Sequence, residues 1–312
     1  MLAYKKIFSD LFEEVRKVVV GQDKVIEQIM ISILADGNAL LEGYPGLAKT
    51  LTVRTLAKIM DLRFSRIQFT PDLMPSDITG TYVIEDHDGK REFKFHPGPI
   101  FANLVLADEI NRASPKTQSA LLEAMQEKQV TVGNTTYKLD RPFFVLATQN
   151  PIEQEGTYPL PEAQSDRFLL KIRAEYPSYD EEVEIVNRYA YEQTEKRLKV
   201  VMTKQNLIDL QQLTRQVPIA TDIKQEVVKL VTSTRHQKEI IEYGASPRAS
   251  IGMVVAAKAR ALVNGRNHVS MEDIREVAFP VLRHRIMLNF EAERKGMTQD
   301  DAVKTLLDKI KK

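Results

Sequence analysis

The sequence predicts an α/β protein in which a doubly wound parallel sheet is followed by a smaller all-α domain. Up to Pro177, short apolar runs rich in β-forming residues alternate with segments whose apolar residues recur at helical spacing. That alternation is typical of a parallel sheet with helices on both faces. After Pro177 no comparable strand appears, and the apolar residues keep the helical spacing. We therefore expect a core over residues 1–176 and a helical domain over residues 177–312.

The expected elements follow from these runs in chain order. Core strands are expected at 39–41, 64–69, 104–106, 143–147 and 168–172. Helices of the second domain are expected at 180–191, 204–216, 222–236, 247–264 and 271–279. Two further segments are expected as insertions into the core. One covers residues 69–99, with two strand-like runs around an Asp88-Gly89 turn signal, and the other is a β-hairpin over residues 129–139 that turns at Gly133-Asn134.

Composition and charge exclude several classes of protein. With 43% hydrophobic and 28% charged residues, the chain is globular rather than disordered or fibrous. Its formal net charge of +1 gives no overall attraction to nucleic acid or to an anionic membrane. The absence of Cys excludes disulfides and thiolate metal sites, and the five His residues show no metal-ligand spacing.

The same survey bears on the cellular compartment. A chain without Cys suits a reducing compartment. No apolar run is long enough to cross a bilayer. The charged residues within the N-terminal apolar stretch favour an amphipathic helix over a signal peptide. We therefore expect a cytoplasmic protein without membrane insertion.

The strongest chemical signal lies between the first predicted strand and the helical pattern after it. Residues 43–50 read Gly-Tyr-Pro-Gly-Leu-Ala-Lys-Thr. The N–H groups of such a loop and of the following helix N-terminus converge on an anion, which predicts a phosphate-binding loop. Lys49 would contact the β- and γ-phosphates, and the Thr50 hydroxyl would bind Mg²⁺. The expected nucleotide contacts in this segment are Gly43, Tyr44, Pro45, Gly46, Leu47, Ala48, Lys49, Thr50 and Leu51.

One position departs from the usual pattern of this loop. Ala48 replaces the last Gly, and its methyl group could crowd a backbone conformation that Gly tolerates better. The alternative interpretation of the whole segment is a Pro-Gly turn followed by a helix with a surface Lys. The motif alone does not decide between them.

Two further strands end in polar residues. The run Leu-Val-Leu-Ala at 104–107 ends in Asp108 and Glu109, and acids at the carboxyl edge of a parallel sheet can hold hydrated Mg²⁺. Asp108 would organise the metal, and Glu109 would polarise the attacking water. The strand at 143–147 leads to Asn150, which would help to fix that water between the loop and the acids. The alternatives are a solvated acidic turn and an ordinary Asn-Pro turn.

With these motifs in order, the chain resembles the AAA+ ATPases and, among them, the MoxR family. The resemblance spans nearly the whole chain. It rests on the loop at 43–50 and on Ala-Asp-Glu-Ile-Asn-Arg-Ala at 107–113, Ala-Thr-Gln-Asn-Pro at 147–151, Leu-Pro-Glu-Ala-Gln-Ser-Asp-Arg-Phe at 160–168 and Ser-Pro-Arg-Ala at 246–249. It implies an AAA+ P-loop core with a helical lid, and ATP and Mg²⁺ as cofactors. The family also tolerates Ala at position 48.

The resemblance further assigns roles to single residues. It implies that Asn150 is sensor 1 and that Gly21 and Gln22 lie near the adenine. It makes Arg167 the arginine finger that reaches a neighbouring subunit's γ-phosphate, and Arg248 sensor 2 of the lid. Independently, Ser246 and Pro247 mark a helix start, where the cation of Arg248 is disfavoured unless an anion lies nearby. A surface role for Arg248, and a structural pairing of Arg167 with Asp166, stay open.

The expected function is that of a nucleotide-dependent homo-oligomeric ring, a hexamer by resemblance. MoxR relatives imply chaperone-like remodelling, assembly or metal insertion alongside a protein with a von Willebrand factor A domain. One alternative is a nucleic-acid-translocating motor, for which Lys128, Lys138 and Arg141 are few basic contacts and Tyr137 is the one candidate stacking ring. The other is a switch whose ATP state controls partner binding while hydrolysis stays slow.

Overall fold

The computed structural model describes residues 2–87, 90–151, 156–190 and 196–309, and a five-stranded sheet forms its centre. The strands are β1 (Ala39–Glu42), β2 (Phe64–Gln68), β5 (Leu104–Asp108), β8 (Phe144–Gln149) and β9 (Leu170–Arg173). They lie in the order β2-β5-β8-β1-β9, and each neighbouring pair is parallel. All five predicted strands are present, with small shifts at their ends.

Helices cover both faces of the sheet, so the predicted doubly wound fold is confirmed. Alternate residues of a strand point to opposite faces, and the two hydrophobic cores divide β5 accordingly. Leu104 and Leu106 belong to the core shared with α1 (Leu2–Arg16), α2 (Asp23–Leu34) and α3 (Lys49–Ile59). Val105 and Ala107 belong to the core beneath α5 (Pro115–Glu127).

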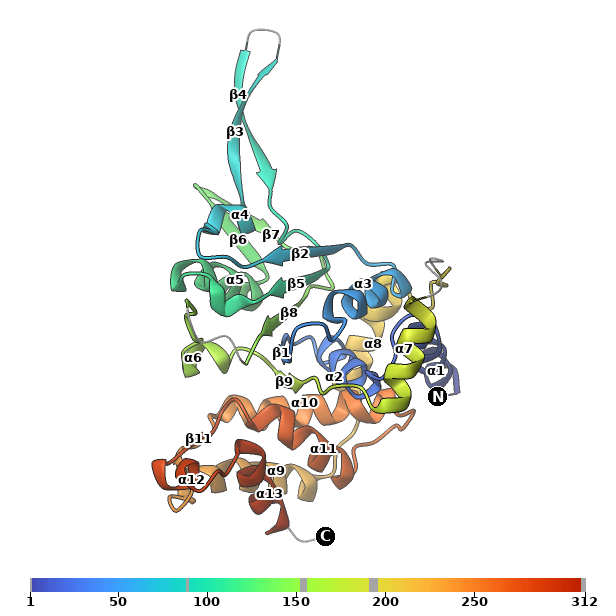
Figure 1. The fold of residues 1–312 in the computed structure, drawn as a ribbon, viewed down its shortest axis with the longest axis vertical. Coiled ribbons are helices and arrows are strands. Elements are labelled where there is room, and N and C mark those ends of the chain that lie inside the picture. Colours follow the sequence, from blue (N-terminus) through green and yellow to red (C-terminus); the bar gives the residue numbers. More distant parts are fainter. Residues whose placement is uncertain (1, 88–89, 152–155, 191–195, 310–312) are drawn as a thin grey trace.

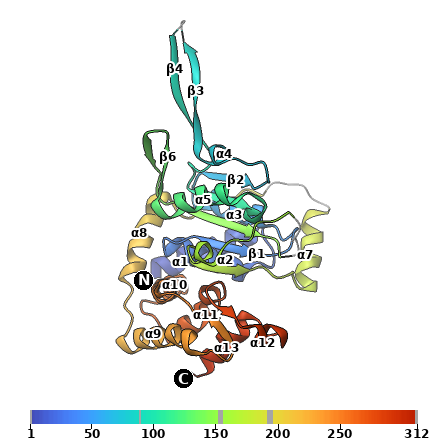
Figure 2. The ribbon, with the colours of Figure 1, turned by 90° about the vertical axis from the view of Figure 1, so that its left-hand side faces the viewer.

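The two predicted insertions are both antiparallel hairpins (Figures 1 and 2). The first has a short α4 (Pro75–Thr79) and then β3 (Gly80–His87) and β4 (Lys90–Pro97), which project from the core as an arm; the Asp88-Gly89 turn lies outside the described residues. The second pairs β6 (Gln129–Val132) with β7 (Thr135–Lys138).

An aromatic cluster joins the bases of the two hairpins. Phe95 of β4 stacks on Tyr137 of β7 with 4.2 Å between ring centroids, and the hydroxyls of Tyr137 and Tyr82 lie 2.7 Å apart. Phe101 packs edge-on against both stacked rings. The two hairpins are therefore held together at their bases, and Tyr137 is a packing residue.

The second domain is mostly helical, as predicted. Its elements are α7 (Tyr179–Tyr189), α8 (Lys204–Gln216), α9 (Thr221–His236), α10 (Pro247–Val263), α11 (Met271–Leu282), α12 (Phe290–Arg294) and α13 (Gln299–Asp308). The core also contains α6 (Glu162–Ser165) and the 3₁₀ turn η1 (Ile110–Arg112). The expectation of no further strand was wrong in one detail, because β10 (Ile241–Tyr243) and β11 (Met287–Leu288) form a small ribbon. Strands this short leave no alternating pattern to detect.

The exact boundary between the domains stays a prediction. Helices α7 and α8 follow Pro177 but contact the core, since Tyr189 donates to the carbonyl of Val18 and Gln211 donates to that of Ile33 at 2.7 Å. Helices α9 to α13 form the bundle below the sheet in Figure 1.

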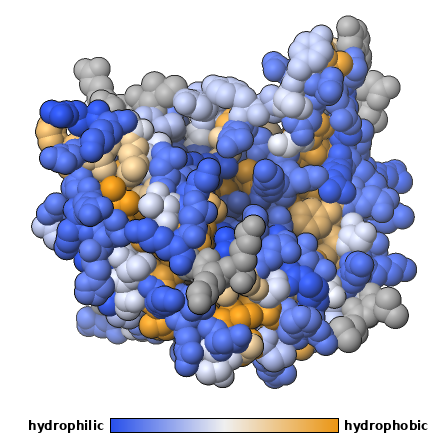
Figure 3. Space-filling view, turned by 90° about the horizontal axis from the view of Figure 1, so that it is seen from below, coloured by the Kyte–Doolittle hydropathy of each residue, from blue (hydrophilic) through white to orange (hydrophobic). Residues whose placement is uncertain are grey.

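None of the helices in the described ranges is long and apolar enough to cross a membrane. Figure 3 shows the face seen from below as largely hydrophilic, with apolar side chains in separate patches.

Three consecutive lid residues fasten the bundle to β9, the edge strand of the sheet. Arg283, His284 and Arg285 follow α11, and their side chains donate to backbone carbonyls on or just before β9. The acceptors are Phe168 for His284 and Arg285, Leu169 for Arg285 and Lys171 for Arg283. Burial, together with the charge of Arg285, holds the pKa of His284 well below its usual value, so this ring is neutral. The outer side of the edge strand β9 is thereby covered by the lid.

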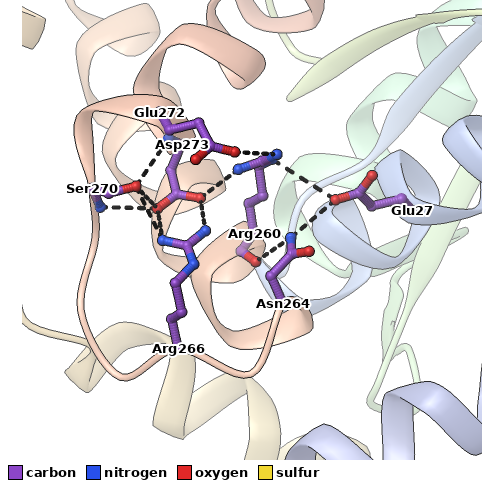
Figure 4. A network of polar contacts seen from close by, with 7 residues as sticks. All are labelled: Glu27, Arg260, Asn264, Arg266, Ser270, Glu272 and Asp273. Carbon is purple, nitrogen blue, oxygen red and sulfur yellow. Dashed lines mark hydrogen bonds and ion pairs between the residues drawn. The ribbon is translucent and has the colours of Figure 1, made fainter.

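A second polar network ties the lid to the core (Figure 4). Asp273 on α11 is fully buried and accepts hydrogen bonds from Arg260, at 2.7 Å, and from Arg266. Arg260 also lies 3.8 Å from Glu27 on α2 of the core, and Asn264 donates to the same carboxylate at 3.1 Å. Burial alone raises the pKa of Asp273, but the bonds from Arg266, Ser270 and Arg260 outweigh it and lower the pKa.

Asp273→Asn is expected to destabilise the lid by about 3 kcal/mol near neutral pH, because two arginines lose a buried carboxylate partner. Since the folded-state pKa is depressed, the contribution is complete above the unfolded value of about 4 and is lost as pH falls through the folded value. Urea unfolding of both proteins across this range measures it.

The neighbouring Glu272 provides the control for that prediction. Glu272 is exposed and lies 3.5 Å from Arg260, so Glu272→Gln should change stability by less than about 1 kcal/mol. A cost of Asp273→Asn that stays constant below about pH 4 would contradict the role given to its charge.

Candidate active site

The loops that carry the predicted site follow three neighbouring strands. In the sheet, β8 lies between β1 and β5. The register pairs Glu42 with Gln149 and Ala107 with Ala147, so the carboxyl ends of the three strands meet at one edge. Asn150 follows β8 there, between the phosphate-binding loop after β1 and the acids at the end of β5. The structure thus brings together three motifs that are far apart in sequence.

The phosphate-binding loop turns through two residues with positive φ. Gly46 has φ 84°, and Ala48 has φ 52° and ψ 24° directly before α3. The left-handed region costs a residue with a side chain roughly 1–2 kcal/mol, which explains why the usual pattern has Gly where this chain has Ala48. Lys49 begins α3, and its Nζ donates to the carbonyl of Gly43. The ammonium group therefore reaches back across the loop.

The acidic pair at the end of β5 is held by β8. Buried Thr148 donates from Oγ1 to Asp108 Oδ1 at 2.6 Å and accepts the N–H of Glu109 at 2.8 Å. Glu109 has φ 57° and ψ 51°, a conformation that is rare outside Gly. Backbone strain of this kind clusters at functional sites. The strain and the two Thr148 bonds indicate that the fold fixes the position of both acids.

Further side chains contact the two carboxylates, and those on β2 were not among the predicted site residues. Arg66 donates to Asp108 Oδ2 from Nε at 3.1 Å and from Nη2 at 2.6 Å. Gln68 donates to Glu109 Oε2 at 2.7 Å, and Arg112 donates to the same oxygen at 3.0 Å. Their contact with the acids follows from the pairing of β2 with β5, which places Gln68 opposite Asp108.

A pocket of about 200 Å³ lies beside the phosphate-binding loop. It is lined by Val18, Val19, Val20, Gln22, Gly46, Leu47, Ala48, Leu51, Pro177, Ile185 and Tyr189. Gln22 is buried and donates to the carbonyl of Glu175 at 3.4 Å. The predicted contacts near the adenine and in the loop therefore meet in one mainly apolar pocket. The contribution of α7 was missed because this helix belongs to the second domain.

The remaining predicted nucleotide contacts lie around this pocket. Gly21 has φ 71°, and a Cβ there would lie 3.0 Å from the carboxylate of Glu181. Tyr44 stacks on Tyr176, with 5.0 Å between ring centroids. Pro45 is exposed beside it, and Thr50 is the half-buried second residue of α3.

Arg167 and Arg248 lie at the opposite edge of the sheet, where the amino ends of the strands meet. The register pairs Leu170 with Ala39 and Arg173 with Glu42, so the chain enters β9 at the edge opposite the phosphate-binding loop. Arg167 stands just before β9 and donates to the carbonyl of Leu122 on α5 at 3.4 Å. The structure therefore does not bring Arg167 together with its own chain's phosphate-binding loop.

Asp166 pairs with the lid and not with its neighbour in sequence. It accepts from Arg285 Nε at 2.7 Å and from Ser246 Oγ at 3.0 Å, and Arg248 Nη1 lies 3.9 Å away. The structural pairing of Arg167 with Asp166 that the sequence left open is thus replaced by a cluster around Arg285. That cluster holds Arg248 against Asp166, the residue directly before Arg167.

A cavity of about 500 Å³ lies at this second edge, between α5 and Arg167. It is lined by Ser119, Leu122, Glu123, Gln126, Glu127, Gln129, Gln164 and Arg167. The cavity is larger than the pocket at the loop, but its two acids would repel phosphates. The loop pocket is therefore the better nucleotide site.

The residues at the loop fit a magnesium nucleotide. A Cβ placed on Gly46 would meet no atom within 4 Å, so the backbone is open to a ligand. Lys49 supplies positive charge, and Thr50 and Asp108 supply the oxygen ligands that Mg²⁺ prefers. Among the described residues there is no cluster of three or more His, Cys, Asp or Glu side chains that would hold a metal alone. Phosphate and water would complete the coordination, as is usual for Mg²⁺.

Comparison with known proteins agrees with this geometry. Residues 38–170 match the model of the ATPase family associated with various cellular activities (AAA), and residues 233–306 match the AAA lid domain. The chain is 44% identical over 305 residues to Chaperone MoxR1 of Mycobacterium tuberculosis, which covers 95% of this chain and 80% of the relative. It is 30% identical over 315 residues to Protein MoxR of Methylorubrum extorquens, which covers 92% and 90%.

A solved structure extends the likeness to three dimensions. The crystal structure of a candidate ATPase from Cytophaga hutchinsonii matches with a TM-score of 0.93 and 48% identity, over 99% of this chain and 96% of that one. Both the core and the lid are included in these matches. With its phosphate-binding loop, its acidic strand and its lid in this arrangement, the chain belongs to the MoxR family of AAA+ ATPases.

Proposed function

We propose that this chain binds ATP with Mg²⁺ beside the phosphate-binding loop and hydrolyses it at a site that a second copy completes. One observation carries the proposal: the loop, the acids and Asn150 lie at one edge of the sheet, whereas Arg167 and Arg248 lie at the other. Strand β9 has 4 residues between these edges, a separation of about 13 Å. The two arginines therefore serve the nucleotide of a neighbouring copy.

Each side chain at the loop edge has a separate task. Lys49 would neutralise the β- and γ-phosphates, and Thr50 and Asp108 would hold Mg²⁺. Bound Mg²⁺ supplies positive charge to the phosphate oxygens. Asn150 orients the attacking water. Arg66, which pairs with Asp108 in this structure, would have to release that carboxylate when the metal binds.

Glu109 accepts the proton of the attacking water. Gln68 and Arg112 both donate to its Oε2, which leaves Oε1 as the atom that takes the proton. From the neighbouring copy, Arg167 stabilises the charge that develops on the γ-phosphate, and Arg248 binds the phosphates from the lid side. A single copy therefore binds ATP but turns it over slowly.

We place this ATPase in a homo-oligomeric ring, a hexamer by family resemblance, that remodels, assembles or loads metal into a partner protein in the cytoplasm. The relative from Mycobacterium tuberculosis is named Chaperone MoxR1, which supports the chaperone-like role. A von Willebrand factor A domain protein is the partner class that the sequence resemblance suggests.

The structure offers little support for the alternative of a nucleic-acid motor. Tyr137, the one candidate stacking ring, is stacked on Phe95, and Lys128 forms an ion pair with Asp36. Two of the four residues considered for that role are thus engaged within the chain. Measured turnover distinguishes the alternative of an ATP-state switch with slow hydrolysis from a motor, because both would use the same site geometry.

Lys49→Ala is expected to weaken ATP binding by roughly 10- to 100-fold, because charge-assisted hydrogen bonds to phosphate are lost. Calorimetric titration with ATP measures the affinity. Lys58→Ala, at the last turn of the same helix, is the matched control and should bind normally. Equal affinities of the wild type and Lys49→Ala would reject the phosphate-binding loop.

Glu109→Gln is expected to bind ATP as the wild type does and to hydrolyse it roughly 10²- to 10⁴-fold more slowly, since an amide cannot accept the water's proton. Phosphate release under saturating ATP measures turnover, and calorimetry measures binding. Glu276→Gln, an exposed acid on α11, is the control and should be fully active. Wild-type turnover by Glu109→Gln would move the base to another residue.

A further inference from the structure

Helix α7 carries an apolar stripe on its outer side. Tyr179, Val183 and Val186 recur at helical spacing, and the first and last are 82% and 50% exposed. The structure describes the whole of this helix, and none of its residues is buried. An adjacent face of α7 presents Ile185 and Tyr189 to the nucleotide pocket. The stripe therefore runs directly beside the pocket proposed for the nucleotide.

A second exposed apolar group lies on the lid, and we call it the lid patch: Tyr243, Ile251, Met287 and Phe290. Tyr243 and Met287 are opposite each other in the β10–β11 ribbon, so their side chains share one face. Phe290 begins α12 and is 78% exposed. Ile251 is 66% exposed and lies one turn after Arg248 on α10, so these two side chains project from the same side of the helix.

The stripe and the lid patch lie on opposite flanks of the molecule. In Figure 1, α7 is at the right, and β11 and α12 are at the left. The left flank also contains α6, which leads into Asp166 and Arg167. Because Ser246 donates to Asp166, the start of α10 lies against this same corner of the core. The lid patch therefore borders the two arginines.

We propose that the stripe on α7 of one copy packs against the lid patch of the next copy, and that this contact seats the two arginines at the nucleotide. The inference rests on the function proposed above, since it takes the site to be shared. When Arg248 enters a neighbour's nucleotide pocket, Ile251 is carried to the rim of that pocket. Helix α7 forms one side of that rim, and its outer side carries the apolar stripe.

The occupant of the stripe is thus a second copy of this chain. Two different surfaces on opposite flanks form a head-to-tail contact, and such contacts close into a ring when the rotation between neighbouring copies closes. Burying both groups at once removes apolar side chains from water on each partner. The same contact couples assembly to ATP, because Ile185 and Tyr189 on the inner side of α7 line the nucleotide pocket.

The absence of Cys in the chain allows a direct test by site-specific cross-linking. The double variant Val186→Cys with Ile251→Cys, treated with a short bis-maleimide in the presence of Mg²⁺ and ATP, should give a ladder of covalent oligomers. Each single variant should stay monomeric on a denaturing gel. Dimers from Val186→Cys alone would indicate a symmetric contact of α7 with itself and would overturn the inference.

A matched control separates this contact from chance collision. Val228 on α9 is 51% exposed, nearly the same as Val186, but lies in neither surface. Val228→Cys with Ile251→Cys should give no ladder. A ladder from this pair as strong as that from Val186→Cys with Ile251→Cys would also overturn the inference.

Charge substitutions provide a second, independent readout. Val186→Glu and Ile251→Glu, each alone, should be monomers in mass measurements with ATP, whereas Val228→Glu should assemble as the wild type does. Mixing Val186→Glu with Ile251→Glu leaves one intact pair of surfaces, so the mixture should form dimers and nothing larger. Full rings from either single variant would show that the two surfaces bind something other than a second copy.

Failure of this inference can be told apart from failure of the proposed function. Both readouts follow assembly and need no hydrolysis. If turnover still requires two copies but neither cross-links nor mixed dimers appear, the shared site stands and the α7 contact is wrong. If no oligomer of any kind forms with ATP, the shared site itself fails.

Discussion

The parallel register of the central sheet is the constraint on which the rest of the molecule depends. Because β1, β8 and β5 run in the same direction in adjacent positions, their carboxyl ends bring the phosphate-binding loop, Asn150 and the two acids to one edge. The same register sends the start of β9, with Arg167 before it, to the opposite edge. A chain of this topology therefore offers a nucleotide site on one flank and the cations for such a site on the other.

The lid reinforces that division. Arg285 is almost fully buried and binds both Asp166 and the backbone just before β9, so the lid is fastened to the start of this strand, next to Arg167. The network around Asp273 ties the lid to α2 as well. With the lid held in this way, Arg248 shares a corner with Arg167, so in the proposed assembly one docking event would deliver both side chains. Helix α7, in contrast, lines the pocket beside the phosphate-binding loop.

Much of this was accessible from the sequence, for reasons that differ between parts of the chain. The five strands and the long helices are marked by apolar runs, and Gly46, Lys49 and Asp108 belong to motifs whose spacing reflects the ligand. Arg66 and Gln68 could not be selected, because their role comes from the pairing of β2 with β5, which the sequence does not specify. The contribution of Ile185 and Tyr189 and the cluster around Asp166 depend on how the second domain packs, and long-range packing leaves no local pattern. The β10–β11 ribbon is too short for any periodicity to appear.

The central claim, that each site is completed by a neighbouring copy, is tested most directly by mixing two inactive proteins. Arg167→Ala should keep ATP binding but lose turnover by about 10³-fold or more, and Glu109→Gln should be nearly inactive as well. In mixed assemblies some sites combine an intact Glu109 with an intact Arg167 from the neighbour, so the mixture should hydrolyse ATP well above the sum of the two separate proteins. No recovery, in a mixture whose subunit exchange is verified by mass measurement, would contradict the account and make Arg167 a residue of its own chain's structure.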